Sequence, residues 1–427
     1  MRGEVAAIGR EGFRCRNSCS RIWNCTMNYQ SQFEPQKHLA PLGFQECPAQ
    51  SQPGVRGILY QGPRYHGKPT SCFAWLGLPE GASERKRVPG IVLVHGGGGT
   101  AFADWVRIWT ERGYAAIAMD TCGCQPAWAP DIYWAPQWPR LPDGGASGWG
   151  GFDQLDEAPA DQWVCQATAC VLRATAVLRM LPQVDGTQVG IAGISWGGYL
   201  TLVATTVAPQ GTYRFAIPVY ASAGFTRFQT GILLGRPEVT AGQADEWTKR
   251  WDPLPALKRN RTPMLFLTDA EDLAFPAPSW QQTTDAVAGP VQRSMRIEFP
   301  HDHQSSFHSR TEAVFAEAVR QGNKLPVWGK PVQEGRRLAC EICANGRRFC
   351  ETSLFYTRAT GFWGDRRWRA VPATLRNGVL SAVLPPETTA AFFGLKDTQD
   401  CRWSSDLMSI SLITNNLIFR GSRRIWQ

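Results

Sequence analysis

The sequence predicts an α/β fold in which a doubly wound, mostly parallel sheet is followed by a small all-β domain. The chain of 427 residues is longer than one hydrophobic core usually organises, so we expect more than one domain. Apolar strands alternate with helical segments from about residue 88 to about residue 322. Beyond about Pro331, short aromatic and β-branched runs separated by Gly, Pro and Asn replace this alternation.

These observations divide the chain into three parts. Residues 1–50 are predicted to be an irregular or disordered extension, residues 51–330 the main domain, and residues 331–427 a small β-sandwich-like domain. The start of the extension lacks the apolar segment of about 7 to 15 residues that a secretory signal needs. Met27 is an alternative start, and the sequence leaves the cellular location unknown.

The main domain opens with an antiparallel hairpin and continues with a βαβ unit. The hairpin joins "GVRGILYQG" to "TSCFAWLGLPEG". The strand "GIVLVHGGGGT" then runs into four glycines, and the helix "AFADWVRIWTERG" and a second apolar strand, "YAAIAMD", follow it. Continuous apolar strands indicate a sheet that is covered by helices on both faces.

The second half of the main domain repeats this pattern. Residues 161–181 carry apolar side chains at spacings of three and four, which predicts an amphipathic helix with one face on the sheet. Further strands are expected at residues 188–193, 214–222, 262–272 and 294–303, and further helices at residues 197–208 and 310–322.

The composition argues against several classes of partner and cofactor. The net charge of +9 comes from Lys and Arg residues that are spread along the chain, so we expect no nucleic acid. No run approaches the ~18 apolar residues of a membrane helix, so we expect no membrane. The cysteines number 13 and cannot all pair within one chain. Cys340, Cys343 and Cys350 lack the fourth ligand of a zinc site, and we expect no metal or other cofactor.

The segment "VGIAGISWGGYL" contains the candidate nucleophile, Ser195. Gly193 to Gly197 fit the pattern GxSxG, with an apolar strand before the serine and a helix after it. This context is typical of a nucleophile elbow, in which flanking glycines allow a strained turn and the helix start favours developing negative charge. The alternative is a glycine-rich turn without chemistry.

A serine hydroxyl needs a base, and in this kind of fold the chain order is Ser, acid, His. Of the six histidines, His301, His303 and His308 follow Ser195. We predict His301 as the base, because it ends the last strand of the series, with His303 as the alternative.

The acid is expected in the loop after the preceding strand, where it would orient the imidazole. The segment "MLFLTDAEDLAFP" offers two aspartates at suitable positions. We predict Asp272, which lies a few residues into the loop, and keep Asp269 as the alternative, which could instead cap local backbone.

Acyl transfer also needs two donors for the oxyanion, commonly the amide after the nucleophile and one from the loop after an earlier strand. These are predicted to be the backbone N–H groups of Trp196 and Gly97, with Gly98 as the next candidate. His95 is expected to hold this glycine loop in shape.

An insertion between the second βαβ strand and the long helix is rich in tryptophan. Its tryptophans are Trp128, Trp134, Trp138 and Trp149. Flat aromatic side chains beside a catalytic edge could stack on sugar rings; the alternative is that they form a small core for the loop itself.

Five segments together resemble the α/β-hydrolase superfamily, and within it the acetylxylan esterase and cephalosporin-C deacetylase-like branch, near the dienelactone hydrolases. They are "LVHGGGGTAFADWV", "ERGYAAIAMDTCG", "VDGTQVGIAGISWGGYLT", "LFLTDAEDLAFP" and "FPHDHQSSF". The resemblance spans roughly residues 55 to 322 and implies a triad of Ser195, Asp272 and His301. The sequence departs from the branch at Gly97, where an aromatic residue is often found, and in its tryptophan-rich insertion and β domain.

The motifs and the resemblance together predict a serine hydrolase of carboxylic esters. We expect it to deacetylate a carbohydrate or small-molecule ester through an acyl-enzyme. The alternatives are a dienelactone-hydrolase-like or prolyl-oligopeptidase-type hydrolase of the same fold, and a non-catalytic carbohydrate-binding protein. The elbow serine disfavours the first, because dienelactone hydrolases generally use cysteine there, and the lack of propeller-length repeats disfavours the second.

Overall fold

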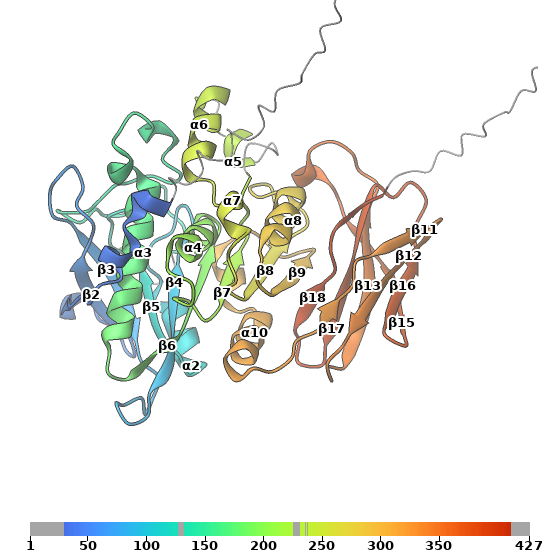
Figure 1. Cartoon of the computed structure of the whole chain (residues 1–427), viewed down its shortest axis with the longest axis horizontal. Helices are drawn as coiled ribbons and strands as arrows, with labels where there is room; N and C mark the ends of the chain where they lie inside the picture. Colours follow the sequence, from blue (N-terminus) through green and yellow to red (C-terminus); the bar gives the residue numbers. More distant parts are fainter. Residues whose placement is uncertain (1–29, 127–131, 225–230, 235, 237, 411–427) are drawn as a thin grey trace, which may run out of the picture.

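A computed structural model describes residues 30–126, 132–224, 231–234, 236 and 238–410 (Figure 1). The described residues contain a nine-stranded sheet in the order β1-β2-β3-β5-β4-β6-β7-β8-β9. From β5 onward in this order, the strands β5, β4, β6, β7, β8 and β9 are parallel. The strands β1, β2 and β3 add an antiparallel edge. The strands are β1 Phe44–Glu46, β2 Arg56–Gln61, β3 Ser71–Gly77, β4 Val88–Val94, β5 Ala115–Met119, β6 Val184–Ile194, β7 Ala216–Val219, β8 Met264–Asp269 and β9 Val291–Arg296.

Helices cover both faces of this sheet. One face packs against α3, α4 and α8, and the other against α2 and α10. Alternate residues of β4 divide between the two cores, which explains why its sequence is apolar throughout. The described helices are α1 Pro35–His38, α2 Ala103–Glu111, α3 Trp163–Met180, α4 Trp196–Val207, α5 Gly231–Leu234, α6 Ala241–Trp251, α7 Leu254–Leu257, α8 Ala277–Ala286, α9 His303–Phe307 and α10 Arg310–Gln321. The predicted fold class is confirmed.

The chain before residue 50 is more regular than predicted. Residues 1–29 of the predicted extension, with Met27, lie outside the described residues, but residues 44–46 form β1, which pairs with β2. Phe33 is buried, and its ring centroid lies 5.7 Å from that of Trp251. The Arg173 side chain of α3 donates from Nε to His38 Nδ1 at 3.1 Å. The segment therefore covers the outer side of α3, and α3 is buried on more than the one face expected of it.

Two antiparallel sheets follow β9. One has the order β10-β12-β16-β15 with β11 beside β12, and the other the order β14-β13-β17-β18 with β19 beside β17. Their facing side chains, among them Leu338, Leu354 and Phe393, form a third core. The strands are β10 Val327–Trp328, β11 Val332–Glu334, β12 Arg337–Cys343, β13 Phe349–Thr357, β14 Arg369–Pro372, β15 Thr374–Arg376, β16 Val379–Val383, β17 Ala390–Asp397, β18 Arg402–Ser404 and β19 Met408–Ser409.

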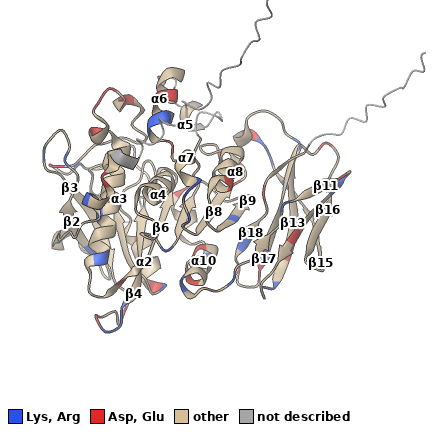
Figure 2. Ribbon diagram, in the orientation of Figure 1, with Lys and Arg blue, Asp and Glu red and all other residues tan. Residues whose placement is uncertain are grey.

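Charged residues are distributed over both parts of the chain. Figure 2 shows Lys and Arg interspersed with Asp and Glu on the ribbon, without one long basic run. Among the described residues, no helix has both the length and the apolar character that a membrane span requires.

Candidate active site

Ser195 lies on the sharp turn between β6 and α4, and β6 lies between β4 and β7 in the sheet (Figure 1). Its backbone has φ 57° and ψ −120°, a conformation that non-glycine residues rarely adopt and that carries strain. The Ser195 N–H donates to Val219 O of β7 at 2.8 Å, which ties the turn to the neighbouring strand. The serine is thus held out from the carboxyl end of β6.

The glycines around Ser195 are required by close backbone contacts. A Cβ atom on Gly193 would lie 2.1 Å from Gly197 O, and a Cβ atom on Gly197 would lie 2.0 Å from Val94 O. No side chain fits at either position. The GxSxG pattern is therefore explained by packing of Gly193 against the first turn of α4 and of Gly197 against the end of β4.

Ser195 faces a pocket of about 350 Å³, which His301, Gly97 and Trp134 also line. The pocket lies at the carboxyl ends of the parallel strands, where ligands bind in open α/β sheets. The Ser195 hydroxyl makes no hydrogen bond to any described residue. Catalytic hydrogen bonds are often formed only when substrate is bound.

His301 is hydrogen-bonded to Asp272. The two side chains meet at 2.8 Å between His301 Nδ1 and Asp272 Oδ2. Asp272 is buried, and its other oxygen, Oδ1, accepts from the N–H groups of Ala274 and Phe275 at 2.8 Å each. These two bonds fix the carboxylate in place, so its orientation toward the imidazole is built into the loop after β8.

Burial and Asp272 shift the pKa of His301 in opposite directions. Burial lowers the pKa of His301, but the negative charge of Asp272 and its hydrogen bond raise it, and the net result lies above the usual value of 6.5. Because Nδ1 is bonded to a carboxylate, we assign the neutral ring's proton to Nδ1, which leaves Nε2 as the basic nitrogen.

His303, the alternative base, occupies a different environment. Its Nε2 accepts from the Gly96 N–H at 3.0 Å, and its ring centroid lies 4.8 Å from that of Phe102. Burial, helped by the charges of His95 and His301, lowers the pKa of His303 to about 3. His303 is therefore a neutral acceptor that holds the glycine loop.

Asp269, the alternative acid, is also engaged with backbone. Its Oδ1 accepts from the Glu271 N–H and its Oδ2 from the Phe299 N–H, both at 2.6 Å. Burial raises the pKa of Asp269 to about 6. Asp269 thus joins the loop after β8 to the loop after β9, and the structure does not place it against either histidine by a hydrogen bond.

The glycine loop after β4 is shaped by buried polar contacts. His95 Nδ1 donates to Gly96 O at 2.8 Å, and His95 Nε2 accepts from the Thr121 N–H at 3.0 Å. Among the described residues no acceptor is found for the Gly97 N–H, whereas the Gly96 and Gly99 amides both have one. Gly97 lines the pocket with Ser195, and Trp196 begins α4 directly after the serine.

The tryptophans of the insertion have different surroundings. Trp138 is buried and donates from Nε1 to Gly98 O at 3.0 Å, so it supports the glycine loop. Trp149 is half-buried, whereas Trp134 is 65% exposed and lines the pocket. Trp128 lies outside the described residues. Trp138 therefore has a structural role, and Trp134 has the exposure at the pocket that stacking on a sugar ring would need, so that role stays a prediction.

Two aromatic residues beside His301 were not predicted from the sequence. The Tyr220 ring stacks on the imidazole with centroids 4.7 Å apart, and its hydroxyl donates to Pro300 O at 2.8 Å. Phe275 lies parallel to the imidazole at 6.2 Å. The sequence could have pointed to Tyr220 only through its position just after β7, because residues at the carboxyl ends of parallel strands gather at the site. Within the described ranges, no cluster of three or more His, Cys, Asp or Glu side chains could hold a metal.

Comparison with known proteins finds matches to two hydrolase families. The model of the acetyl xylan esterase family, AXE1, matches residues 16–228, and the model of the prolyl oligopeptidase family matches residues 165–318. An acetyl xylan esterase from Paenibacillus sp. R4 has a TM-score of 0.53 at 21% identity, covering 68% of this chain and 94% of that one.

A second solved structure covers the same share of this chain. Acetyl xylan esterase 1 from Thermoanaerobacterium sp. JW/SL YS485 has a TM-score of 0.50 at 14% identity, covering 68% of this chain and 93% of that one. At these identities the two structures show a shared fold. No curated protein matches the sequence.

Proposed function

We propose that this chain is a serine carboxylic-ester hydrolase of the acetyl xylan esterase branch of the α/β-hydrolases, and that Ser195, His301 and Asp272 are its triad. The observation that carries this proposal is the Asp272–His301 hydrogen bond of 2.8 Å at a pocket that Ser195 also lines. The finer proposal is that the substrate is an acetyl ester of a carbohydrate or small molecule.

The proposed reaction has two halves. Ser195 Oγ attacks the ester carbonyl while His301 Nε2 takes the hydroxyl proton, and the resulting imidazolium is stabilised by Asp272. The N–H groups of Gly97 and Trp196 hold the oxyanion. His301 then protonates the leaving alcohol, which leaves an acyl-enzyme. In the second half a water molecule gives a proton to His301 and attacks the acyl group; His301 then returns that proton to Ser195 Oγ as the acyl bond breaks, which releases the acid and restores the free serine.

Trp134 supports a carbohydrate as the alcohol part of the substrate. A large aromatic side chain that is 65% exposed at the mouth of a pocket leaves apolar surface in contact with water. The C–H face of a sugar ring covers such a surface well, and aromatic side chains offer contact area at a low entropy cost. The pocket volume of about 350 Å³ suits a short acyl group with part of a sugar ring.

The first experiment tests the nucleophile. Purified protein and Ser195→Ala are assayed on p-nitrophenyl acetate and butyrate, with Ser83→Ala, in an exposed loop, as the matched control. We expect Ser195→Ala to lose about 10³-fold or more in turnover and Ser83→Ala to match the parent. Equal, near-background rates for all three proteins would contradict the esterase proposal.

A substrate panel then separates the acyl acceptors. Acetylated xylan and a cephalosporin acetyl ester represent the proposed substrates. A dipeptide anilide represents the peptidase alternative, which the match of residues 165–318 to the prolyl oligopeptidase family favours. We expect hydrolysis of at least one acetyl ester and none of the anilide.

A second experiment tests the role of Trp134. Trp134→Ala should raise KM for acetylated xylo-oligosaccharides about fivefold to tenfold and leave p-nitrophenyl acetate unchanged, because only the sugar would stack on the ring. Ile132→Ala, in the same insertion and 43% exposed, is the control. Equal effects on both substrates would mean that Trp134 supports the pocket and does not bind sugar.

A further inference from the structure

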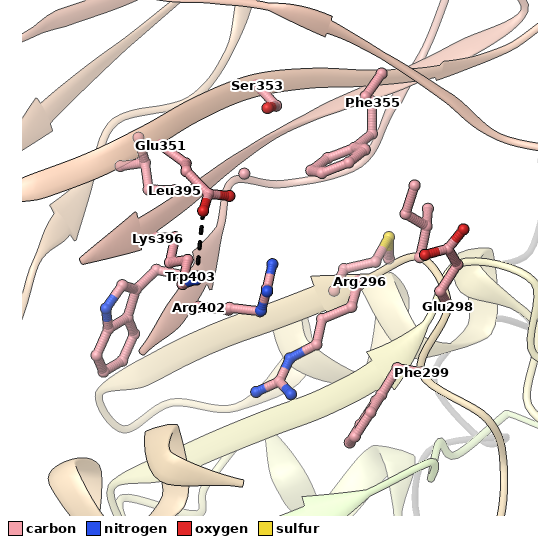
Figure 3. Close-up of a pocket in the computed structure, with 14 residues that line it drawn as sticks. Arg296, Glu298, Phe299, Glu351, Ser353, Phe355, Leu395, Lys396, Arg402 and Trp403 are labelled. Atoms are coloured by element: carbon pink, nitrogen blue, oxygen red, sulfur yellow. Dashed lines mark ion pairs between the residues drawn. The ribbon is translucent and has the colours of Figure 1, made fainter. Parts of the chain in front are cut away.

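A second cavity lies where the C-terminal strands pack against β9. Its volume is about 410 Å³, and its lining comes from β9 and the residues after it, and from β13, β14, β17 and β18. Figure 3 shows residues of β13, β17 and β18 on one side of this space, among them Phe355 and Arg402, and Arg296 and Glu298 on the other. None of them lines the pocket around Ser195, so the cavity is a separate candidate site.

Two arginines reach this cavity from opposite walls. Arg296 comes from β9 and Arg402 from β18, both line the cavity, and the charge of Arg402 helps to lower the pKa of Arg296. Among the described residues, neither makes an ion pair. The third cation, Lys396, differs because it pairs with Glu351 at 3.3 Å and with Asp400 at 3.1 Å. The two guanidinium charges are thus left without a carboxylate partner.

Arg296 is held in place by neutral groups. Its Nη2 donates to Ser309 Oγ at 3.0 Å and to Thr311 Oγ1 at 3.1 Å, and its Nε donates to Ser294 Oγ at 3.0 Å. The guanidinium carbon lies 4.5 Å from the centre of the Phe299 ring. These contacts fix the orientation of the group without neutralising it, so little entropy would be lost when an anion binds.

The acids near Arg296 do not fully compensate its charge. Burial lowers the pKa of Arg296 to about 10 against the opposing effect of Glu312, so the guanidinium stays protonated at neutral pH. Burial raises the pKa of Glu312 itself to about 7, which leaves it only partly ionised there. Glu298 also lines the cavity, but it is exposed, and Figure 3 shows it at the far end from Arg402.

We propose that this cavity binds a small ligand through a carboxylate or phosphate group held between Arg296 and Arg402. The two guanidinium groups suit either oxyanion, because Arg402 presents N–H donors in a planar fork and Arg296 adds its positive charge and the N–H donors of Nη1, the nitrogen that its hydroxyl partners leave unused. The volume of about 410 Å³ admits a ligand of monosaccharide size, and the Phe355 ring offers it an apolar wall. A sugar acid or a sugar phosphate has both the anionic group for the arginines and a ring to pack on this wall.

Calorimetric titration of the whole protein at low ionic strength tests this site. The probes are D-glucuronate, inorganic phosphate and uncharged D-glucose. We expect saturable binding of glucuronate or phosphate and none of glucose, and the stronger anion identifies the oxyanion that the site prefers. Arg402→Gln should weaken binding about tenfold or more, because it removes one charged partner.

Three further proteins make the result specific. Arg376→Gln removes an exposed arginine of β15, away from the cavity, and should bind like the parent. Ser195→Ala should also bind like the parent, which separates this site from the esterase proposal. Arg296→Lys keeps the charge but loses the fork, and should weaken binding while the protein still unfolds cooperatively.

Three outcomes would overturn the proposal. The first is no saturable binding of either anion up to about 10 mM. The second is glucose binding as strongly as the anions, and the third is unchanged affinity in Arg402→Gln.

Discussion

At the scale of single residues, the site depends on two histidines that are separated by one aspartate and have opposite environments. His301 is bonded to Asp272, and its pKa is raised above the usual value. His303 accepts from the Gly96 amide, and its pKa is lowered to about 3. Of the two, only His301 has an acid partner that stabilises its protonated form, as a general base in a triad requires.

The pH dependence of activity distinguishes these two histidines. A base must be neutral, so activity should fall as pH drops through its pKa. We expect kcat/KM to fall below a pH that lies above the usual 6.5 of histidine, because the pKa of His301 is raised. A base with the pKa of His303, about 3, would keep activity constant down to far lower pH.

Asp272→Asn gives the matched variant for this measurement. The change removes the charge that raises the pKa of His301 but keeps the burial that lowers it, so the acidic limb should move to lower pH. The rate itself should drop by roughly 10³-fold to 10⁴-fold. An acidic limb that stays in place in this variant would argue against Asp272 as the partner of the base.

At the scale of elements, the β6–α4 turn shows how packing selects the residues beside a nucleophile. The turn is pressed against the end of β4, where a Cβ atom on Gly197 would come within 2.0 Å of Val94 O. The same contact holds the start of α4 beside the glycine loop. The glycine is therefore needed for the approach of two backbone segments.

Gly197→Ala should destabilise the protein and reduce activity together. The clash is with backbone, which cannot move without displacing β4, so we expect a loss of about 3 kcal/mol in the free energy of unfolding. Gly242→Ala is the control, because that glycine lies in α6 with no atom within 4 Å of the added Cβ. It should stabilise the helix by up to about 1 kcal/mol. Chemical denaturation measures both, and similar values would contradict this explanation.

At the scale of the whole molecule, the C-terminal strands are integrated into the main cores. Trp403 of β18 belongs to the core beneath α2 and α10, and Trp368 to the core on the other face. The Met295 N–H donates to Ser404 Oγ at 2.9 Å, and the Trp368 N–H to Glu271 Oε1 at 3.1 Å. The second bond reaches the residue before Asp272, so the C-terminal strands help to position the acid loop.

Removing the C-terminal strands should therefore affect every substrate. A chain that ends after Lys330 loses the contacts of both tryptophans, at a cost of roughly 3 to 5 kcal/mol for each large aromatic side chain. We expect a lower unfolding temperature and loss of activity on p-nitrophenyl acetate as well as on acetylated xylan. A chain that ends after Ile410 keeps the described contacts and is the control. Loss on xylan alone would instead indicate a polysaccharide-binding domain.

Local patterns allowed much of the fold and the candidate site to be predicted. Apolar strands alternating with helices predicted the sheet, and the strand–Gly–Ser–Gly–helix order predicted the elbow, because periodicity and glycine spacing are properties of neighbouring residues. The short β1 strand was missed, since three residues at a sheet edge carry no periodic signal. Tyr220 and Phe275 were also missed, because their contact with His301 joins three separate loops.

The sequence by itself determined the alternation of the main strands with the helices α2, α3, α4 and α10, and the residue types available for acyl transfer, since both depend on local spacing. Tertiary structure decided which histidine meets Asp272, which tryptophan reaches the pocket, and how closely the C-terminal strands join the main cores. The physical reason is that hydrogen bonds, burial and charge act between groups that are close in space. Two histidines separated by a single aspartate in the chain can therefore have opposite pKa shifts.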